Sequence, residues 1–501
     1  MHLVKMGLAF LAAHLATALF FVFNRAPGTS AALVGLPLDD AWIHLVYARS
    51  LAALHGFAFN PGQLETGSTS PLWAIFLVPA SWAARLFGIG VVIPAKVTGI
   101  LAATAASLGA ARLLRKLNFG KAVQAAAGMV IAADPALAFA QVSGMEIMVA
   151  SALVLWTLGE AAAERWRVAS LLAALAPLAR PELVLLTVLV LLLAQWRLHQ
   201  EQVSARARLV LVAPMVACVG GWMVYCLVVS GYPLPSTFYA KFASRQEFFA
   251  LNLENIVTKV APTWPWFAHG TGVVLWGAGL VVLVRRGWVA ILAAVFPVLF
   301  LVSVSASQLL SEPLPFYWQR YLLPTQALLL VTLVVGADAA IAWSFRGRNK
   351  AWAPAYAAGV AALVLGSLAG LPKALRESAD LFAWNCQNIE ELDVAMATWL
   401  REHTPADETI AVTDAGAARY FADRRIVDLV GLNDHRHLHR EPNHERDVLA
   451  VRILSTFPAW MPSMRDNPAW QVVHRTSTDH LTICKCPQSE IVAYRRLDPS
   501  R

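Results

Sequence analysis

The chain has 501 residues, of which 58% are hydrophobic and only 14% are charged. A water-soluble protein of this length needs a more charged surface, so the composition excludes an ordinary soluble globular protein. The net charge of +8 comes mainly from short basic clusters between long apolar runs. That pattern is typical of a polytopic helical membrane protein and not of a nucleic-acid-binding surface.

Eleven apolar segments predict transmembrane helices. The first is interpreted as an uncleaved span, because no small-residue cleavage site follows it before Asn24. A tight hairpin through Ala179–Glu182 is predicted to join two of the shorter segments. The predicted spans are 6–23, 91–111, 122–140, 145–161, 167–179, 181–196, 208–229, 271–284, 288–304, 322–343 and 352–370.

The apolar segment 71–87 decides the orientation of the chain. If it lies on the outer membrane surface instead of crossing, every basic cluster falls on the cytoplasmic side, as the positive-inside rule requires. The N-terminus is then inside and the C-terminus outside. The clusters are Arg112/Arg115/Lys116/Lys121, Arg165/Arg167, Arg197/Arg206/Arg208, Arg285/Arg286 and Arg346/Arg348/Lys350.

Three of the outer segments stand out on this topology: loop 24–90, loop 230–270 and residues 371–501. The chain therefore divides into a transmembrane module over 1–370 and a small extracytoplasmic domain over 371–501. Strand-like runs at 409–413, 426–430 and 470–474 and a helical pattern over 388–402 predict a mixed α/β fold for this domain.

Three of the five cysteines, Cys386, Cys484 and Cys486, fall in the predicted outer domain. An oxidising compartment would allow one disulfide there, with one thiol left over. Cys484 and Cys486 are too close in sequence for an ordinary unstrained bridge, which favours a bond from Cys386 to one of them.

Two adjacent carboxylates, Asp39 and Asp40, stand a few residues after the first predicted span. Carboxylates at this position are costly if they enter hydrocarbon, so they need a reason to be there. One reading is a base acting on a substrate at the membrane–water boundary. The other is a solvated cap of the helix that follows, because Asp is a good N-cap residue.

The sequence that begins with this pair contains motifs of a known protein family. Asp39–Trp73 reads DDAWIHLVYARSLAALHGFAFNPGQLETGSTSPLW, and further motifs follow in order along most of the chain. Together they resemble the bacterial branch of GT-C glycosyltransferases that includes the mycobacterial terminal arabinofuranosyltransferase. The further motifs are Ser143–Glu146 (SGME), Ala179–Glu182 (ARPE), Pro233–Lys241 (PLPSTFYAK), Arg320–Pro324 (RYLLP) and Val427–Asp434 (VDLVGLND).

The resemblance implies a GT-C fold and a polyprenyl-phosphate sugar donor used on the outer face of the bacterial inner membrane. The absence of a GxGxxG or P-loop sequence agrees with a donor that is not a nucleotide sugar. Two features depart from the family: the outer domain is smaller than in the mycobacterial enzyme, and Ile147 stands where many relatives have Thr. The resemblance therefore supports the chemistry better than it supports arabinofuranose as the sugar.

For the acidic pair, the resemblance favours Asp39 as the general base that takes a proton from the attacking sugar hydroxyl. Neighbouring residues of a helix point in different directions, so Asp40 is expected to do another job. It would orient the acceptor or cap the helix, and it is the alternative base.

Lys241 and Arg320 are the predicted ligands of the donor phosphate, because cations stabilise the charge that grows on a phosphate leaving group. The alternative is that both side chains snorkel at span ends. Glu146, Tyr239 and Tyr321 are predicted to bind the sugar or the acceptor. The alternative for Glu146 is a helix-terminal carboxylate facing water, and Arg180 and Glu182 are expected to pair within their hairpin.

The histidines of 435–444 suggest a zinc site, but their spacing is no recognised ligand set and Arg436 and Arg440 intervene. A solvated loop is the preferred interpretation. No cofactor is predicted to be required, although some GT-C enzymes use a divalent metal, which at Asp39 remains an alternative.

The predicted function is transfer of a sugar to a glycan, lipid or protein acceptor. The alternative is a transporter, flippase or ligase for a polyprenyl-linked glycan. A transporter is expected to carry charged or broken segments at mid-membrane depth, whereas here the ionisable residues gather at the outer ends of the predicted spans.

Overall fold

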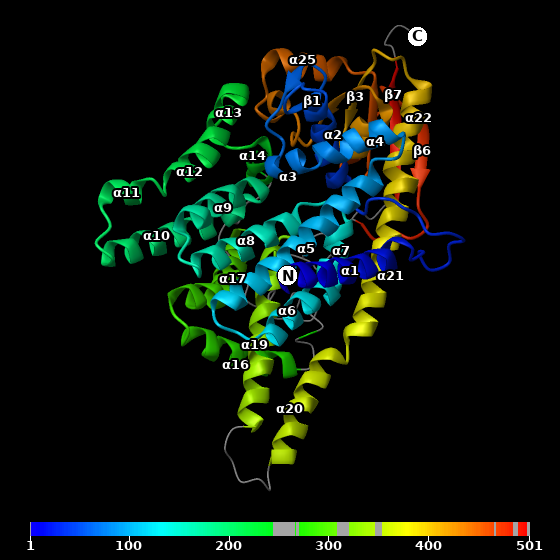
Figure 1. Cartoon of the computed structure of the whole chain (residues 1–501). Helices are drawn as coiled ribbons and strands as arrows, with labels where there is room; N and C mark the ends of the chain where they lie inside the picture. The colour runs from blue at the N-terminus through cyan, green and yellow to red at the C-terminus, as the bar shows by residue number, and fades with distance from the viewer. Residues whose placement is uncertain are drawn as a thin grey trace.

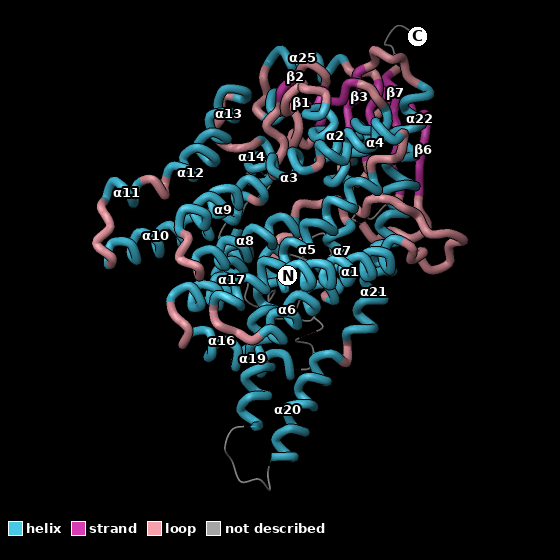
Figure 2. The backbone as a smooth tube through the Cα atoms, viewed as in Figure 1, coloured by secondary structure: helices cyan, strands magenta, loops and turns pink. Residues whose placement is uncertain are grey.

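The computed structural model describes residues 2–243, 266, 270–307, 320–345, 353–464, 467–483 and 489–497. Most of them form a helical bundle, with a small sheet at one end (Figures 1 and 2). The helices of the bundle are α1 (His2–Val22), α5 (Val92–Lys116), α6 (Lys121–Ala133), α7 (Pro135–Val142), α8 (Ile147–Ala161), α9 (Trp166–Ala179), α10 (Val184–Gln200), α11 (Ala205–Leu209), α12 (Ala213–Met215), α13 (Gly221–Ser230), α16 (Thr271–Val284), α17 (Trp288–Ser307), α19 (Gln326–Phe345) and α20 (Ala353–Leu368).

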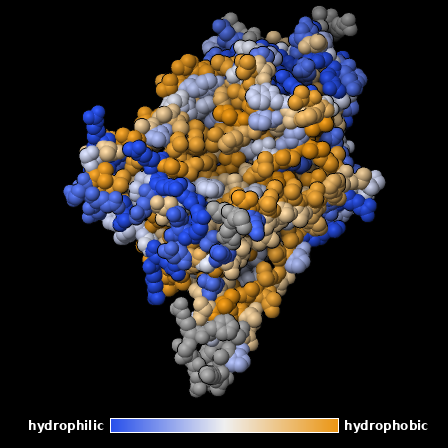
Figure 3. All heavy atoms as spheres, in the orientation of Figure 1, coloured by the Kyte–Doolittle hydropathy of each residue, from blue (hydrophilic) through white to orange (hydrophobic). Residues whose placement is uncertain are grey.

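In the described part of the chain, six helices are long and apolar enough to cross a membrane, or seven if one bent pair counts as a span. Five shorter apolar helices accompany them, so the predicted number of eleven stays a prediction. Hydrophobic side chains form a broad band over the bundle in Figure 3, and hydrophilic ones gather around the sheet and also at the left and lower left of the view. This is the surface of a multi-pass membrane protein. The six are Val4–Val22, Val92–Lys116, Pro181–Gln200, Ala205–Ser230, Leu323–Ser344 and Ala358–His403.

The single span predicted over 122–140 is wrong in one respect: it is two helices, α6 and α7, bent by 66°. Pro135 begins α7, and Asp134 caps it by accepting a hydrogen bond from the Leu137 amide at 2.9 Å. A proline cannot continue a helix without losing a backbone hydrogen bond, which explains the break. The hairpin through Ala179–Glu182 is confirmed, because α9 and α10 flank a single 3₁₀ turn there.

Small residues allow close helix crossings inside the bundle. A Cβ atom added to Gly279 of α16 would collide with the backbone carbonyl of Thr332, and one added to Gly336 of α19 would collide with that of Leu275. The two helices therefore touch backbone to backbone, as small residues permit in membrane bundles.

The outer part combines the first outer loop with the C-terminal residues. The first outer loop contains α2 (Asp39–Ala52), β1 (Ala58–Asn60), β2 (Gln63–Leu64), α3 (Pro71–Phe76) and α4 (Val78–Phe87). Helix α14 (Ser236–Ala243) follows α13 of the bundle in the sequence. The C-terminal residues form α21 (Leu371–Ile389), a π-helical turn (Glu390–Val394), α22 (Ala395–His403), β3 (Thr409–Val412), α23 (Gly416–Ala422), β4 (Arg425–Asp428), α24 (His435–Leu438), α25 (Pro442–Ala450), β5 (Ile453–Thr456), β6 (Trp470–Ser477) and β7 (Glu490–Arg496).

The C-terminal sheet has the strand order β4-β3-β5-β7-β6, with the first three strands parallel and the last two antiparallel to their neighbours. The predicted strands at 409–413, 426–430 and 470–474 are confirmed as β3, β4 and β6. Short helices alternate with the parallel strands, so the predicted mixed α/β arrangement is confirmed as well.

The first outer loop is joined to the edge of this sheet. Asn60 of the β1–β2 hairpin donates a side-chain hydrogen bond to the Ile426 carbonyl at 2.8 Å and accepts one from the Ile426 amide at 2.9 Å. Tyr47 of α2 is fully buried and donates to Asn433 Oδ1 at 3.1 Å. These bonds hold α2 between the bundle and the sheet.

Candidate active site

The two carboxylates of the acidic pair face different parts of the molecule, because they follow one another on helix α2. Asp40 points toward a cavity between α2 and the bundle. Asp39 points toward α23 of the C-terminal sheet. The helix geometry thus separates their roles.

Asp39 serves as an anchor between α2 and α23. Its two carboxylate oxygens accept the backbone N–H groups of Gly416 and Ala417, each at 2.6 Å. A Cβ atom on Gly416 would collide with Asp39, so only glycine permits this approach. Burial raises the pKa of the adjacent Asp414 well above its usual value, and the charge of Asp39 raises it further. Asp414 therefore keeps its proton beside the Asp39 carboxylate.

A cavity of about 460 Å³ lies on the other side of α2, and we call it the main cavity. One part of its wall is polar and contains Asp40, His44, Thr69, Ser70, Glu146, Arg180, Glu182, Arg320 and Tyr321. The other part is apolar and contains Ile43, Met145, Pro181, Val184, Leu185, Leu234, Pro235, Phe238, Val304 and Leu432. A molecule with a charged end and a hydrocarbon end matches this division.

Ion pairs organise the polar wall. Arg320, which is only 3% exposed, forms an ion pair of 2.5 Å with Asp40. Arg180 pairs with Glu146 at 2.6 Å and with Glu182 at 3.3 Å, so the expected pairing within the hairpin exists but is the longer of the two. Buried charges need such partners, because an unpaired charge away from water is very costly.

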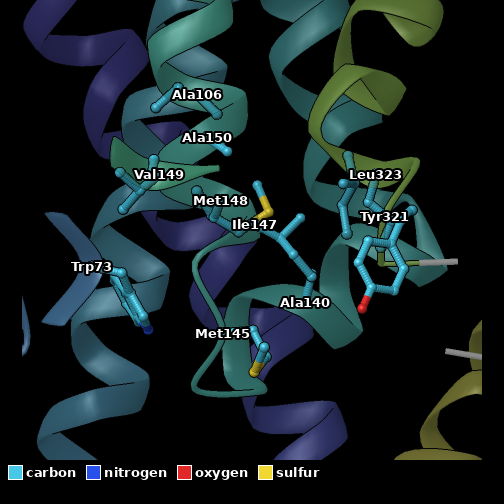
Figure 4. Close-up of a cluster of buried hydrophobic side chains, with 14 of the residues drawn as sticks. Trp73, Ala106, Ala140, Met145, Ile147, Met148, Val149, Ala150, Tyr321 and Leu323 are labelled. Atoms are coloured by element: carbon cyan, nitrogen blue, oxygen red, sulfur yellow. The ribbon is translucent and has the colours of Figure 1, made fainter. Parts of the chain in front are cut away.

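Tyr321 connects the two guanidinium groups. Its ring lies 5.0 Å from the Arg180 guanidinium carbon and 5.2 Å from that of Arg320. Figure 4 shows Tyr321 and Leu323 beside Ile147 at the start of α8, in a cluster of buried apolar side chains. Both guanidinium groups are thereby held against a rigid part of the bundle.

The main cavity brings together four of the predicted site residues: Asp40, Glu146, Arg320 and Tyr321. Asp39 does not line it. The remaining two predicted residues lie on α14, one of them Tyr239, which also does not line the cavity and packs against the rings of Tyr232 and His439. The other is Lys241, whose side chain lies outside the described part of the structure.

His44 was not predicted and belongs to the polar wall. Its Nε2 lies 3.3 Å from the Glu146 carboxylate. It follows Asp40 by one helical turn, so both occupy the same face of α2. The four-residue spacing between Asp40 and His44 could have identified His44 from the sequence, once Asp40 was known to face the cavity.

The solvated loop predicted for the histidines is wrong for two of them. His435 is buried, and its Nδ1 lies 2.7 Å from Glu65, whose side chain is fully enclosed. His444 is also buried and lies 3.0 Å from the Asp434 carboxylate. The first pair joins the first outer loop to the C-terminal residues, and the second connects two positions within the C-terminal residues.

A further histidine joins α24 to the loop before α14. The ring of His439 stacks on that of Tyr232, with 3.6 Å between the ring centroids. Cys386 is a buried free thiol among the described residues, and Cys484 and Cys486, its predicted partners, lie outside them.

A divalent metal would need several carboxylate oxygens close together. Among the described residues, one group of three carboxylates, Asp39, Asp393 and Asp414, has oxygens within 4.8 Å of one another. Both Asp39 oxygens already accept amide hydrogens, and the group does not line the main cavity. In the main cavity, the carboxylates of Asp40 and Glu146 are each paired with a guanidinium. The paired carboxylates of the main cavity therefore do not fit a divalent metal, and the carboxylate group at Asp39 lies outside that cavity.

The C-terminal residues 384–496 match the model of a domain of unknown function, DUF8728. A comparison with curated proteins found no match. Solved structures resemble the whole chain, and they are membrane glycosyltransferases.

ArnT from Cupriavidus metallidurans bound to undecaprenyl phosphate aligns with a TM-score of 0.60 and 14% identity, covering 98% of both chains. The Archaeoglobus fulgidus oligosaccharyltransferase tethered with an acceptor peptide aligns at 0.58 and 12% identity, covering 90% of this chain and 68% of that one. Arabinofuranosyltransferase AftD from Mycobacteria aligns at 0.51 and 14% identity, and this chain spans 40% of its length. At such identities the comparison establishes the fold, and the chain has the fold of the GT-C glycosyltransferases.

Proposed function

We propose that this protein is a GT-C glycosyltransferase that moves a sugar from a polyprenyl-phosphate donor to a hydroxyl group of an acceptor. The observation that carries the proposal is the Asp40–Arg320 ion pair in the wall of the main cavity. It combines a carboxylate that can take a proton with a guanidinium that can bind a phosphate, next to an apolar wall.

The apolar wall accounts for the lipid part of the donor. Val184, Leu234 and Phe238 come from two segments far apart in sequence and line the same side of the main cavity. Polyprenyl chains bind through the burial of apolar surface, which contributes roughly 0.8 kcal/mol for each buried CH₂ group. The first isoprenoid units would lie along this wall, and the phosphate would reach the guanidinium groups.

Asp40 is the proposed general base. Its carboxylate takes the proton from the acceptor hydroxyl as that oxygen attacks the anomeric carbon. The bond between the anomeric carbon and the phosphate oxygen breaks, and its electron pair leaves with the polyprenyl phosphate. The guanidinium of Arg320 then compensates the charge that develops on the leaving phosphate. This moves the role of base from Asp39, the residue favoured by the resemblance, to its neighbour.

The ion pair also couples the two substrates. Before the donor arrives, Arg320 occupies the carboxylate that must later take the proton. A phosphate competes for the same guanidinium, because both anions bind it through charge-assisted hydrogen bonds. Donor binding would thus loosen Arg320 from Asp40 and free the base only when a sugar is in place.

Glu146 and His44 are proposed to bind hydroxyl groups of the sugar or of the acceptor. Glu146 is held by Arg180 on one oxygen, and His44 lies near the other. A carboxylate fixed in this way is a good acceptor for a sugar hydroxyl, because its orientation costs no further entropy. Tyr321 is proposed to contribute through its hydroxyl, as it lines the same wall.

Arabinofuranose is the proposed sugar, and the outer face of the bacterial inner membrane is the proposed location. Both rest on the motifs of the first outer loop. The acceptor is a glycan, lipid or protein hydroxyl. The similarity in fold to AftD, an arabinofuranosyltransferase, supports the sugar assignment, and the similarity to the oligosaccharyltransferase keeps a protein acceptor among the candidates.

The alternative of a transporter or flippase has less support. Polar groups inside the bundle, such as His14, Ser107 and Gln141, are hydrogen-bonded to one another. They act as interhelical contacts and do not line the main cavity. A ligase that transfers a whole glycan uses the same chemistry and differs in the donor.

The deciding experiment is an assay of purified protein with a panel of radiolabelled polyprenyl-phosphate sugars and polyprenyl-linked oligosaccharides. Transfer of a single sugar supports the proposal, and transfer of an oligosaccharide supports the ligase. If no donor supports transfer and the intact lipid moves across the membrane of proteoliposomes, the protein is a flippase and not a glycosyltransferase.

A further inference from the structure

A second cavity lies on the opposite side of α2 from the main cavity. Trp42 and Arg49 are seven residues apart, so they occupy one face of α2. Both line a cavity of about 420 Å³ that we call the α4 cavity. Its wall also contains Val34, Gly35, Ser81, Ala84, Arg85, Ile89, Gly90, Val91, Val92, Glu390, Val394, Tyr420 and Phe421. The two cavities share no lining residue.

Two buried polar groups in this wall have no hydrogen-bond partner. They are the indole Nε1 of Trp42 and the hydroxyl of Ser81, and the two residues are only 4% and 6% exposed. A buried donor without a partner costs about 1–3 kcal/mol, so proteins rarely leave one in place without a use for it. A ligand oxygen in the α4 cavity would satisfy the indole N–H, which can only donate.

The charge of the wall favours an anion. Arg49 and Arg85 bring two positive charges, and Glu390 brings one negative charge. Arg49 is fixed in place, since it donates to the Tyr420 carbonyl at 3.1 Å and lies 4.5 Å above the Tyr420 ring. A guanidinium fixed in advance loses little freedom when it binds a phosphate.

The rings in the wall argue against a glycan as the occupant. Many sugar-binding sites stack the sugar ring on an open aromatic face. The Trp42 ring is covered, with ring centroids of Tyr420 and Phe421 at 4.9 Å and 4.6 Å. The α4 cavity therefore offers N–H and guanidinium donors and no open stacking platform on Trp42.

The surroundings of the α4 cavity favour a lipid. Helix α4, which lies beside α2 in Figure 1, exposes a run of large apolar side chains at its C-terminal end. Among them, Leu86 is 78% and Phe87 is 69% exposed. Exposed apolar residues next to basic ones are typical of a helix that lies in the membrane interface. A phosphate in the α4 cavity would then continue into hydrocarbon alongside α4.

We propose that the α4 cavity binds the phosphate group of a lipid. The phosphate lies between the guanidinium groups of Arg49 and Arg85, the indole N–H of Trp42 donates to one of its oxygens, and the Ser81 hydroxyl bonds to another. The lipid chains run along the exposed apolar side chains of α4. This site is separate from the main cavity and does not depend on the reaction proposed there.

Binding can be measured on the full-length protein in detergent by native mass spectrometry, with the change in transition temperature as a second readout. The probes are phosphatidylglycerol, undecaprenyl phosphate, inorganic phosphate and a soluble oligosaccharide. Arg85→Gln and Trp42→Phe should each weaken binding of the lipid about tenfold or more, as expected for the loss of a charge-assisted or buried hydrogen bond. Arg167→Gln, which removes an exposed charge on α9 at the other end of the bundle, should leave binding unchanged.

Arg85 is exposed, so its replacement should not disturb folding and keeps the test valid if Trp42→Phe is unstable. Dependence on Arg85 for phosphatidylglycerol identifies a membrane phospholipid, and the same dependence for undecaprenyl phosphate alone identifies the carrier lipid. Either result supports the proposal. It is overturned if Arg85→Gln and Arg167→Gln bind both lipids alike, if inorganic phosphate binds as well as the lipids do, or if the oligosaccharide binds through Trp42 and the lipids do not.

Discussion

The carboxylate of Asp40 and the guanidinium of Arg320 meet at 2.5 Å in the wall of the main cavity, although they come from opposite ends of the bundle's sequence. The neighbouring Asp39 carboxylate is occupied by two backbone amides of α23. In the proposed mechanism this ion pair carries out proton transfer and phosphate binding, and the adjacent Asp39 anchors α2.

Replacing each carboxylate of the pair by an amide should separate these roles. Asp40→Asn should lower turnover by about 10²–10⁴-fold, the usual cost of losing a general base, and should leave donor binding intact or stronger because Arg320 loses a competing anion. Asp39→Asn should mainly lower the transition temperature. Turnover, donor affinity and thermal stability of both variants provide the measurement. A severe loss of turnover with normal stability in Asp39→Asn alone would return the role of base to Asp39.

Arg320→Ala should reduce the efficiency of donor use by about one to two decades, because a charge-assisted contact contributes roughly 1.5–3 kcal/mol. Arg320→Lys should recover only part of the loss, since an ammonium group lacks the fork geometry of a guanidinium. The apparent constants for donor and acceptor should be measured separately. Arg475→Ala, which breaks an exposed pair with Glu490, is the matched control and should change neither constant. Equal effects of Arg320→Ala on donor and acceptor would speak against a phosphate contact.

The buried pair of Glu146 and Arg180 should show strong coupling between mutations. Glu146→Gln leaves the Arg180 guanidinium buried with a weaker partner, and the loss of one member of such a pair costs about 3–5 kcal/mol. Glu146→Leu combined with Arg180→Met should be less destabilising than either single change. A double-mutant cycle of thermal stability tests this, and simple additivity of the two changes would contradict it.

The outer part of the protein should become more stable as the pH falls from about 8 to about 5. Burial raises the pKa of Asp428 to about 6 and that of Asp414 well above its usual value, so the folded state binds these protons more tightly than the unfolded chain. Their contribution is therefore lost as the pH rises. Burial opposes protonation of His435, but its hydrogen bond with Glu65 raises the pKa, and this contribution also declines at high pH.

Asp414→Asn should flatten this pH dependence, because an amide donates the same hydrogen bond to Asp39 without titrating. Apparent transition temperatures at one scan rate provide the measurement, since membrane proteins often unfold irreversibly. An unchanged slope in the variant, or greater stability of the parent protein at high pH, would contradict the assignment of the proton to Asp414.

The predicted topology places the C-terminal sheet outside the cytoplasm. A periplasmic phosphatase fused after residue 501 should therefore be active, and a fluorescent protein that folds only in the cytoplasm should stay dark at the same position. The opposite pattern would mean that segment 71–87 crosses the membrane.

The sequence predicted the helical bundle and the α/β C-terminal region, because long apolar runs and alternating strands are local patterns. It also placed Asp40, Glu146, Arg320 and Tyr321 near one another through ordered motifs. It favoured Asp39 over Asp40 as the base, but it could not tell which of the two carboxylates faces the main cavity. Adjacent residues on a helix differ by about 100° in direction, and the rotation of α2 depends on its contact with α23, which comes much later in the chain.

The burial of the histidines could not be predicted from the sequence either. His435 and His444 appear in a polar, charged stretch, and local composition favours exposure. Their burial depends on partners at other places, of which Glu65 belongs to the first outer loop. His44 was missed because an isolated histidine in an apolar helix gives no signal until the cavity-facing side of that helix is known.

The hydrogen bonds between Asn60 and Ile426 have a consequence for biosynthesis. Domains and segments are made in order from the N-terminus, so the first outer loop emerges long before strand β4 exists. Until then, Asn60 lacks its backbone partner and Asp39 lacks the amides of Gly416 and Ala417. Before the last fifth of the chain is made, a nearly complete membrane bundle would thus exist without the contacts that anchor α2. Activity would then depend on the synthesis and folding of this last fifth.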